Sequence, residues 1–394
     1  MRSSRIPVYR DLYWGGSMTD SLSIVIPTNG RHELVTALLD SIHTDAKNAD
    51  LNIEVILVDD SNGTVADQMM QIAAAHNATV IHGVSQVGEK RNAGVMKANH
   101  DLILFLDSDV KIRPGTLRAH VNRLSREPEN VAGCLGKVIF VGQPTYAWQV
   151  IESMQLPLPF SEYPELADYV TWGPTANLCV RRKQFLQVRG FDTTLPRYGG
   201  EDVDLGFRLN NQGLRIATAP DAVAEHAIET WGTWYQNLRR LWSFGLADYY
   251  LLIRHPDRCF YDFPTGPMLW LVQTLVLLVL IARQSITPIA AVCAIGVSVA
   301  AYHLVYALIK REAGSRLRVH LLGPFVFWIM DFAKAFESLR HGRPAFVFQR
   351  IKFHDDSIAL DWKEIAASAW GITASSILYL AVILLAKILA NHVG

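Results

Sequence analysis

A run of large apolar residues that stops on two carboxylates constrains the fold of this chain more than any other feature of its sequence. Residues 102–106 read Leu-Ile-Leu-Phe-Leu, and Asp107, Ser108 and Asp109 follow them. Consecutive apolar residues bounded by polar ones are typical of an interior strand of a parallel sheet, which is buried on both faces. Because open α/β sheets bind ligands at the carboxyl ends of their strands, we expect Asp107 and Asp109 at the edge of a site.

Two carboxylates this close repel each other unless a positive group lies beside them. A divalent cation that carries a diphosphate meets this need, since Mg²⁺ binds one or two carboxylates together with the phosphate oxygens of a substrate. The alternative for an isolated Asp-x-Asp is a turn at the end of a strand, in which one aspartate caps the next segment. The remainder of the sequence has to decide between a metal site and a turn.

Strand-like and helix-like segments alternate before this run. Strands are predicted at residues 23–28, 54–58 and 79–81, and helices at residues 32–42 and 65–76. Strands that alternate with helical segments of about ten to fifteen residues indicate βαβ units and a doubly wound, mostly parallel sheet. Polar residues follow these strands, as a nucleotide-binding crevice requires. The fold class predicted for the first half of the chain is therefore α/β.

Charge and hydropathy limit the partners of the chain. Lys and Arg together number 37, as do Asp and Glu, so the formal charge is zero and nothing indicates a nucleic acid partner. Half of the residues are hydrophobic and 19% are charged, compared with about 25% charged in typical soluble domains. The apolar excess lies beyond residue 262. This uneven distribution predicts a separate α-helical membrane domain at residues 263–394.

Three apolar stretches within this region approach the roughly 20 residues that a helix needs to cross a bilayer. They lie at about residues 267–282, 286–309 and 370–389, and we predict that each spans a membrane. A fourth stretch, residues 321–336, is interrupted by Gly323, Pro324 and Asp331, and we interpret it as an interfacial or re-entrant helix. Residues 229–262 combine aromatic side chains with arginines, which is typical of amphipathic helices at a bilayer surface.

Basic residues predict the orientation in the membrane. Lys310, Arg311, Arg316 and Arg318 directly follow the second predicted span. Because basic loops are retained on the cytoplasmic side, this loop and the amino-terminal domain are both expected to face the cytoplasm. The sequence therefore predicts a multi-pass protein of the cytoplasmic (inner) membrane. Residues 1–20 are interpreted as a lead-in that precedes the α/β domain.

Several short motifs, taken together and in this order, carry a resemblance to a known family. They are Ile24-Val25-Ile26-Pro27-Thr28, Val58-Asp59-Asp60-Ser61, Lys90-Arg91-Asn92-Ala93-Gly94, Asp107-Ser108-Asp109, Gly190-Phe191-Asp192 and Gly200-Glu201-Asp202-Val203-Asp204-Leu205. The chain resembles an inverting family 2 glycosyltransferase with a GT-A fold and carboxy-terminal transmembrane helices. The resemblance implies a catalytic GT-A domain at residues 21–228.

The resemblance also implies roles for individual residues. A divalent metal, Mn²⁺ or Mg²⁺, would be held by Asp107, Asp109 and His226. The nucleotide-sugar donor would contact residues of five separate segments, namely Pro27, Thr28, Asp59, Asp60, Arg91, Asp107, Ser108, Trp172, Thr175 and Asn177. UDP is the expected nucleotide because a carboxylate accepts the imide N–H of uracil, while GDP and dTDP donors remain open. The alternatives are an Asx turn at Asp60, a solvated Arg91 and a packed His226.

Asp202 is the predicted catalytic base, with Glu201 as the neighbour that could serve instead. Inverting transfer needs a carboxylate that takes the proton of the acceptor hydroxyl while its oxygen attacks the anomeric carbon. The alternative is a carboxylate that only caps a helix. Transfer to a polyprenyl phosphate needs no base, so the Gly-Glu-Asp motif favours a hydroxyl acceptor.

We therefore predict transfer of one sugar to a hydroxyl of a lipid, a lipid-linked saccharide or another membrane-held acceptor. Residues 236–242 break the Gln-x-x-Arg-Trp spacing of processive synthases, which favours single-sugar addition over polymer synthesis. Two alternatives remain open. One is a polyprenyl-phosphate glycosyltransferase of cell-envelope biosynthesis, and the other is a non-catalytic membrane scaffold that binds nucleotide sugars.

Overall fold

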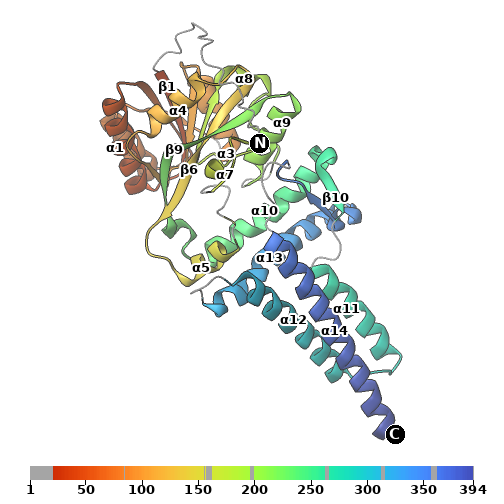
Figure 1. Ribbon diagram of the computed structural model, residues 1–394. Helices are drawn as coiled ribbons and strands as arrows, with labels where there is room; N and C mark the ends of the chain where they lie inside the picture. The colour runs from red at the N-terminus through yellow and green to blue at the C-terminus, as the bar shows by residue number, and fades with distance from the viewer. Residues whose placement is uncertain are drawn as a thin grey trace, which may run out of the picture.

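The computed structural model describes residues 21–394 apart from 84, 155, 157–161, 196–198, 262–265, 312–315, 356–361 and 394. The lead-in predicted for residues 1–20 lies outside the described residues. The chain forms an α/β domain and a helical part that projects away from it (Figure 1).

Four parallel strands form the first half of the central sheet. They are β1 (Ser21–Thr28), β2 (Asn52–Asp59), β3 (Thr79–His82) and β4 (Leu102–Leu106), in the order β3-β2-β1-β4. All residues of β1 and β4 are buried, so the buried strand predicted at residues 102–106 is confirmed. The strands end at one edge of the sheet, where their polar residues meet.

The second half of the sheet is mixed. β8 (Asn177–Arg181) is antiparallel to both β4 and β6 (Val131–Val141), and β6 is parallel to β9 (Arg215–Ala227). Two short strands, β5 (Val110–Ile112) and β7 (Tyr169–Val170), pair antiparallel with β9. The predicted α/β class with a mostly parallel sheet is therefore confirmed.

Helices cover both faces of the sheet. One apolar core lies beneath α1 (His32–Ala49), α2 (Thr64–Ala75) and α4 (Thr116–Ser125). The other lies beneath α3 (Val87–Lys97), α8 (Arg182–Gln187) and α9 (Glu201–Asn211). Alternate residues of β1 face opposite cores, with Ile24 and Ile26 in the first and Val25 in the second, as the pleat of a strand requires.

A layer of helices lies between the sheet and the projecting bundle. α10 (Trp234–Arg254) begins at a capping box of Thr233 and Gln236 and packs against α13 (Leu317–Arg340). The short helix α5 (Tyr146–Ser153) packs against α13, whereas α7 (Tyr163–Leu166) packs against β6 and β9. A two-stranded sheet of β10 (Cys259–Tyr261) and β11 (Gln349–Ile351) follows the ends of α10 and α13.

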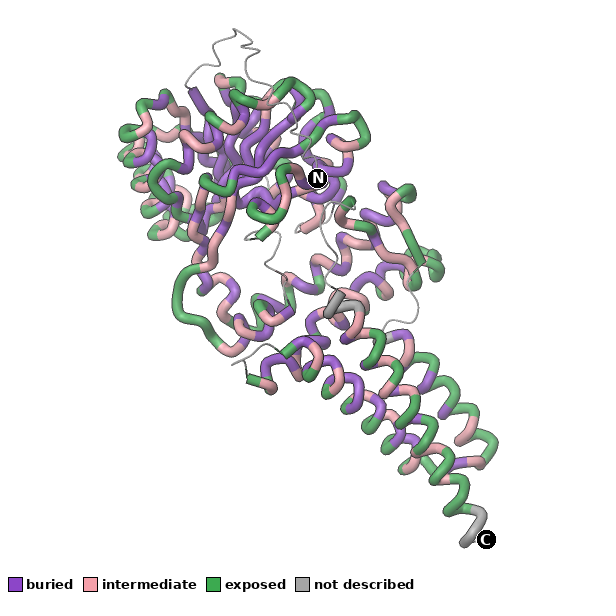
Figure 2. Tube along the Cα trace, viewed as in Figure 1, coloured by how far each residue is buried: buried purple, intermediate pink, exposed green. Residues whose placement is uncertain are grey.

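The projecting bundle consists of α11 (Gly266–Ala282), α12 (Pro288–Lys310) and α14 (Trp362–Val393). Within the described residues, α12, α13 and the part Ala366–Ala390 of α14 are long and apolar enough to cross a membrane, while Met268–Ala282 is shorter. Many large apolar side chains on α11, α12 and α14 are exposed, as the green segments of the bundle in Figure 2 show.

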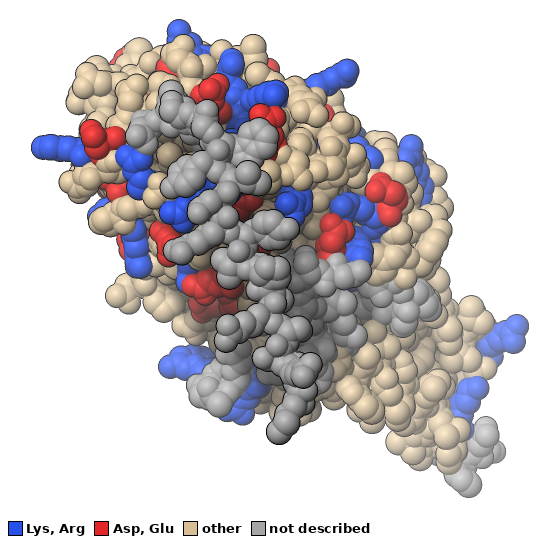
Figure 3. Space-filling model, turned by 45° about the horizontal axis from the view of Figure 1, so that its top comes forward, with Lys and Arg blue, Asp and Glu red and all other residues tan. Residues whose placement is uncertain are grey.

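Charged side chains gather over the α/β domain, whereas the visible face of the bundle carries few of them except near its far end (Figure 3). α13 continues through Pro324 and is longer than the interfacial helix predicted at residues 321–336. It lies beside α10, between the α/β domain and the bundle (Figure 1).

Candidate active site

A cleft of about 930 Å³ opens between the carboxyl ends of the parallel strands and the helices α10 and α13. The residues of the predicted site that line it are Pro27, Thr28, Asp60, Arg91, Asp107, Ser108, Asp109, Trp172, Thr175, Glu201, Asp202 and His226. The fold therefore brings together residues from opposite ends of the α/β domain.

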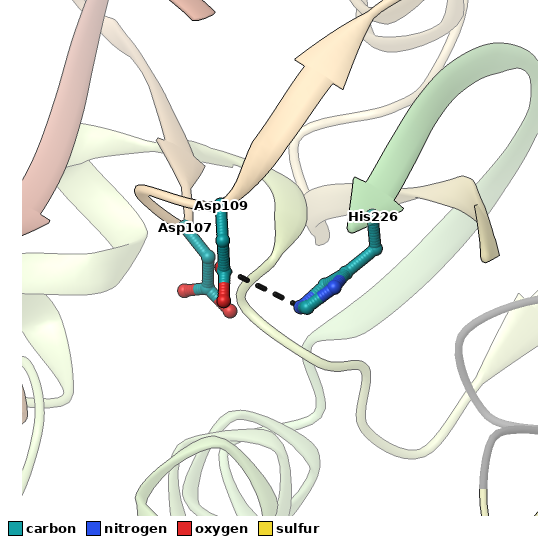
Figure 4. A group of neighbouring side chains, drawn as sticks. All are labelled: Asp107, Asp109 and His226. Atoms are coloured by element: carbon teal, nitrogen blue, oxygen red, sulfur yellow. Dashed lines mark ion pairs between the residues drawn. The ribbon is translucent and has the colours of Figure 1, made fainter. Parts of the chain in front are cut away.

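Asp107, Asp109 and His226 form the candidate metal centre. Each offers one ligand atom, and these three atoms lie within 4.8 Å of one another. The pairing of β5 with β9 sets Val110 opposite His226, which brings the imidazole to the turn after β4. Figure 4 shows the three side chains pointing toward one another. His226 Nε2 lies 3.5 Å from Asp109 Oδ1. Two carboxylates and an imidazole fit a divalent cation and leave coordination positions for substrate oxygens.

Cationic side chains surround Asp109. Arg31 Nη1 lies 2.6 Å from Asp109 Oδ2. Burial alone would raise the pKa of Asp109, but His226, Arg31 and Arg240 outweigh it and hold this pKa below its usual value. Arg31 has a φ of 59°, which lies in the left-handed region that non-glycine residues rarely adopt. Residues held in this conformation are often found at functional sites. Asp109 is thus ionised and ready to bind a cation.

Arg91 connects the candidate metal centre to the loop that carries the predicted base. Its Nη2 lies 2.8 Å from Asp107 Oδ1, and its Nη1 lies 3.0 Å from Glu201 Oε1. The guanidinium is almost completely buried, so the alternative of a solvated arginine does not apply. A buried planar guanidinium with two carboxylate partners fixes their relative position.

The other end of the cleft is closed by Asp60 and Lys90. Lys90 Nζ donates to Asp60 Oδ1 and to the carbonyl oxygen of Thr28, both at 2.6 Å, and Asn29 Nδ2 donates to the same carboxylate oxygen at 2.6 Å. Burial raises the pKa of Asp60, but the bonds from Lys90 and Asn29 lower it below its ordinary value overall. The Asp60 carboxylate is therefore held ionised at the cleft.

Two predicted donor-binding residues do not line the cleft, and the structure corrects their placement. Asp59 accepts from Thr28 Oγ1 at 2.9 Å and from the backbone N–H of Ser61 at 3.0 Å, so it holds the loop after β2. Asn177 is fully buried, contacts His120 Nε2 at 2.8 Å and donates to Ala222 O at 2.9 Å. Both side chains therefore bond to protein groups next to the cleft and stabilise its walls.

Glycine sets the start of α9. Gly200 has a φ of 87°, and a Cβ added there would lie 2.9 Å from the Cβ of Ala247 on α10. Only glycine therefore allows this turn and its close packing on α10. The loop then enters α9 with Glu201 and Asp202 in the first turn, where the helix dipole favours carboxylates.

Asp202 and Glu201 differ in their surroundings. Glu201 is paired with Arg91, whereas Asp202 accepts from the backbone N–H of Val203. Burial and the neighbouring Glu201 charge raise the pKa of Asp202 to about 7. A carboxylate with a pKa near neutrality is suited to take a proton.

Other lining residues were not found by sequence reasoning. One wall of the cleft is basic, because it is lined by Arg31, Lys90, Arg239 and Arg240. The side that α10 and α13 form is apolar and includes Met154, Leu156, Phe244, Phe327 and Met330. Lys90 could have been found from the sequence, since it adjoins Arg91 in the same motif, but no motif pointed to these apolar residues.

A sequence model of one protein family, described as "Glycosyltransferase like family 2", matches residues 20–245. The chain belongs to glycosyltransferase family 2. Its α/β domain accordingly has the GT-A fold of this family, and the resemblance stated from the motifs is confirmed.

Curated relatives of this family 2 chain have varied names. The pre-mycofactocin glycosyltransferase of Mycobacterium tuberculosis is 28% identical over 242 residues, 60% of this chain and 48% of the relative. The O-antigen biosynthesis protein RfbC of Myxococcus xanthus is 26% identical over 59% of this chain and 19% of the relative. The validoxylamine A glucosyltransferase of Streptomyces hygroscopicus is 26% identical over 51% of this chain and 50% of the relative. The chain thus spans at most half the length of each.

Solved structures also resemble the family 2 chain at low identity. The mannosyltransferase PcManGT from Pyrobaculum calidifontis, in complex with GDP-Man and Mn²⁺, aligns over 96% of this chain and 90% of its own, at 14% identity and a TM-score of 0.44. S. aureus TarS in complex with UDP-GlcNAc covers 52% of this chain and 58% of its own, at 18% identity and a TM-score of 0.40.

Proposed function

We propose that this family 2 member is a membrane-anchored inverting glycosyltransferase that moves one sugar from a nucleotide-diphosphate sugar to a hydroxyl of a membrane-held acceptor. The observation that carries the proposal is the arrangement of Asp202 and the Asp107–Asp109–His226 cluster around one cleft. Arg91 ties the two parts together. A base and a site for the leaving group are the two parts that such a transfer requires.

The donor is proposed to lie along the basic wall of the cleft. Asp60 and Thr28 bind the base, for which UDP is the first choice, and Arg31, Arg91 and Arg240 lie near the diphosphate. Asp107, Asp109 and His226 would hold a divalent cation, and this cation would neutralise the charge that develops on the departing diphosphate. Charge stabilisation of this kind is commonly the largest single contribution to catalysis.

The transfer itself is proposed to be a single displacement. The acceptor hydroxyl gives its proton to Asp202, and its oxygen forms a bond to the anomeric carbon of the donor. The bond between that carbon and the diphosphate oxygen breaks, and its electron pair leaves with the diphosphate. Because attack comes from the face opposite the leaving group, the anomeric configuration inverts. Glu201 remains paired with Arg91 and holds that guanidinium in place.

The membrane-side helices support an amphipathic acceptor. The cleft is apolar where Phe244, Phe327 and Met330 of α10 and α13 line it. Beyond these helices lie the exposed apolar surfaces of α11, α12 and α14, which match a bilayer interior better than water. We therefore propose that the bundle lies in the cytoplasmic membrane, and the basic residues that follow α12 favour the cytoplasmic side for the α/β domain.

The test is an Asp202→Asn variant with Asp67→Asn as its matched control. Asp67 is an exposed carboxylate in the first turn of α2, as Asp202 is a carboxylate in the first turn of α9. Asp202→Asn should lower hydroxyl transfer by about 10²–10⁴-fold, the usual contribution of a general base. Transfer that survives in this variant would favour a polyprenyl phosphate acceptor, and donor binding without consumption by the unmodified protein would favour the scaffold.

A further inference from the structure

The segment that follows β11 returns from the membrane-side part to the wall of the cleft. Phe353 and His354 line the cleft directly. The backbone N–H of Asp355 donates to Thr171 Oγ1 at 3.1 Å, and this hydroxyl lies 3.2 Å from Asp355 Oδ2. Arg258 Nη1 also lies 3.2 Å from Asp355. These contacts fix the segment against the residues that precede β8.

His354 is held by two aromatic residues of the α/β domain. Its Nε2 lies 2.6 Å from the hydroxyl of Tyr163, which is 191 positions away in the sequence. Its ring stacks on Trp172 with 5.9 Å between centroids and 18° between planes, and the Tyr163 ring meets it edge-on at 4.6 Å. We call these three residues, Tyr163, Trp172 and His354, the aromatic triad.

The aromatic triad contains two buried nitrogen atoms that have no hydrogen-bond partner among the residues that the structure describes. They are Nδ1 of His354 and Nε1 of Trp172. Burial lowers the pKa of His354 to about 4, so the ring is neutral near pH 7. In the tautomer in which Nε2 accepts from the Tyr163 hydroxyl, the neutral ring carries its hydrogen on Nδ1. Both unpaired atoms are then N–H donors, and a buried donor without a partner is unfavourable.

The aromatic triad lies beside the loop of the predicted base. Trp172 and Phe353 pack against the apolar cluster that includes Val203, the residue directly after Asp202. The backbone of Trp172 also lies close to Gly206, one turn further along α9. All three residues of the aromatic triad line the same cleft as Asp202.

We propose that the aromatic triad is a subsite for a sugar ring of the acceptor, in which Nδ1 of His354 and Nε1 of Trp172 donate to its hydroxyl groups. The inference rests on the proposed function and names its acceptor class: a glycoside whose apolar tail lies toward Phe244, Phe327 and Met330. Two buried donors discriminate strongly against an acceptor that lacks hydroxyl groups, because such a molecule leaves them unpaired. The segment between α13 and α14 thereby supplies an acceptor-binding residue to the catalytic cleft.

The experiment compares n-octyl β-D-glucopyranoside with n-octanol as probe acceptors, using protein purified in a detergent without a sugar headgroup. Nucleotide release is measured with whichever nucleotide sugar the protein consumes. We expect the octyl glucoside to accelerate release and octanol, which has the tail and a hydroxyl but no sugar ring, to have no effect. If neither compound accelerates release, or if both do so equally, the subsite is refuted, although donor consumption still supports the proposed function.

Two variants test the donors individually. The variants are His354→Ala and Trp172→Phe, the second of which keeps an aromatic ring but removes the indole N–H. Each should raise the KM for octyl glucoside about tenfold more than it raises the KM for the nucleotide sugar. His341→Ala is the control, since His341 stacks on Tyr249 outside the cleft lining and should change neither KM. Equal changes in the two KM values would mean that the aromatic triad only supports the fold, and would overturn the proposal.

Discussion

Asp202 and Glu201 are neighbours in sequence, but their surroundings give them different chemistry. Because Arg91 neutralises Glu201 and burial raises the pKa of Asp202 to about 7, Asp202 is the group that gains and loses a proton near neutral pH. The rate of transfer should therefore rise with pH and level off above an apparent pKa near 7, since the base must be deprotonated. A pH profile of kcat/KM that stays flat from about pH 5 to 8 would contradict this assignment.

The same pKa predicts a change in stability. The folded state holds the proton on Asp202 up to a higher pH than the unfolded state, whose carboxyl has a pKa near 3.8. Folding stability therefore falls as pH rises from about 4 through 7, and the loss is complete above the folded pKa. Asp202→Asn should lower activity and yet raise the Tm at about pH 8. A Tm below that of the unmodified protein at this pH would show that the carboxylate does not destabilise the fold.

His226 supplies the third ligand of the candidate metal centre. His226→Ala should raise the Mn²⁺ concentration needed for half-maximal nucleotide release. Loss of a residue that only supports a metal ligand typically weakens metal binding about 10–100-fold, and loss of the ligand itself should cost at least as much. The control is His100→Ala, which lies away from the cleft lining. An unchanged Mn²⁺ requirement would leave His226 as a packing residue against Phe140, whose ring centroid is 5.0 Å away.

Sequence motifs predicted the acidic residues of the site better than the basic and aromatic ones. Asp107 and Asp109 were found because a buried strand ends on them, and the strand order brings them to one edge. Arg31 and His354 carry no local signal, since their contacts with Asp109 and Trp172 arise only from tertiary packing. Asn177 was assigned to the ligand from the family resemblance, although its side chain is turned into the core.

At the level of elements, α10 and α13 form the apolar wall of the cleft, and the distance between these two helices depends on Gly245. A Cβ at this position would lie 2.1 Å from the carbonyl oxygen of Met330, a backbone atom that cannot move away cheaply. Gly245→Ala should therefore lower the Tm by several degrees, since overpacking costs about 1–3 kcal/mol. Gly296→Ala is the matched helical control, with open space around it, and should leave the Tm unchanged or higher. Equal Tm values for the two variants would contradict close packing of α10 on α13.

Periodicity predicted the existence of the elements well and their ends less well. β1, β2 and β3 match the predicted strands because their apolar residues are consecutive and end in polar ones. α1 extends to Ala49, beyond the predicted end at residue 42, since Asp45 and Ala46 are buried against the core despite the mixed polarity of that stretch. Pro324 suggested an interruption at residues 321–336, but α13 tolerates it because its neighbours α10 and α12 pack around the helix.

The whole molecule divides into an α/β domain and an apolar bundle, and the basic loop after α12 predicts which part faces the cytoplasm. In a Cys293→Ala background, a cysteine at Arg283, in the exposed turn between α11 and α12, should react with a membrane-impermeant maleimide in intact cells. A cysteine at Lys111, exposed on β5, should react only after permeabilisation. The reverse labelling pattern would contradict the proposed orientation.

The central claim is that the cleft consumes a nucleotide sugar with the help of a divalent metal. The most direct measurement is nucleotide release from a panel of UDP, GDP and dTDP sugars by the purified full chain, with Mn²⁺, Mg²⁺ or EDTA and with membrane lipid extract added. We expect one donor to be consumed, only when metal is present, and faster with lipid. Donors that bind but are never consumed under any of these conditions would contradict the claim and leave a protein that only binds them.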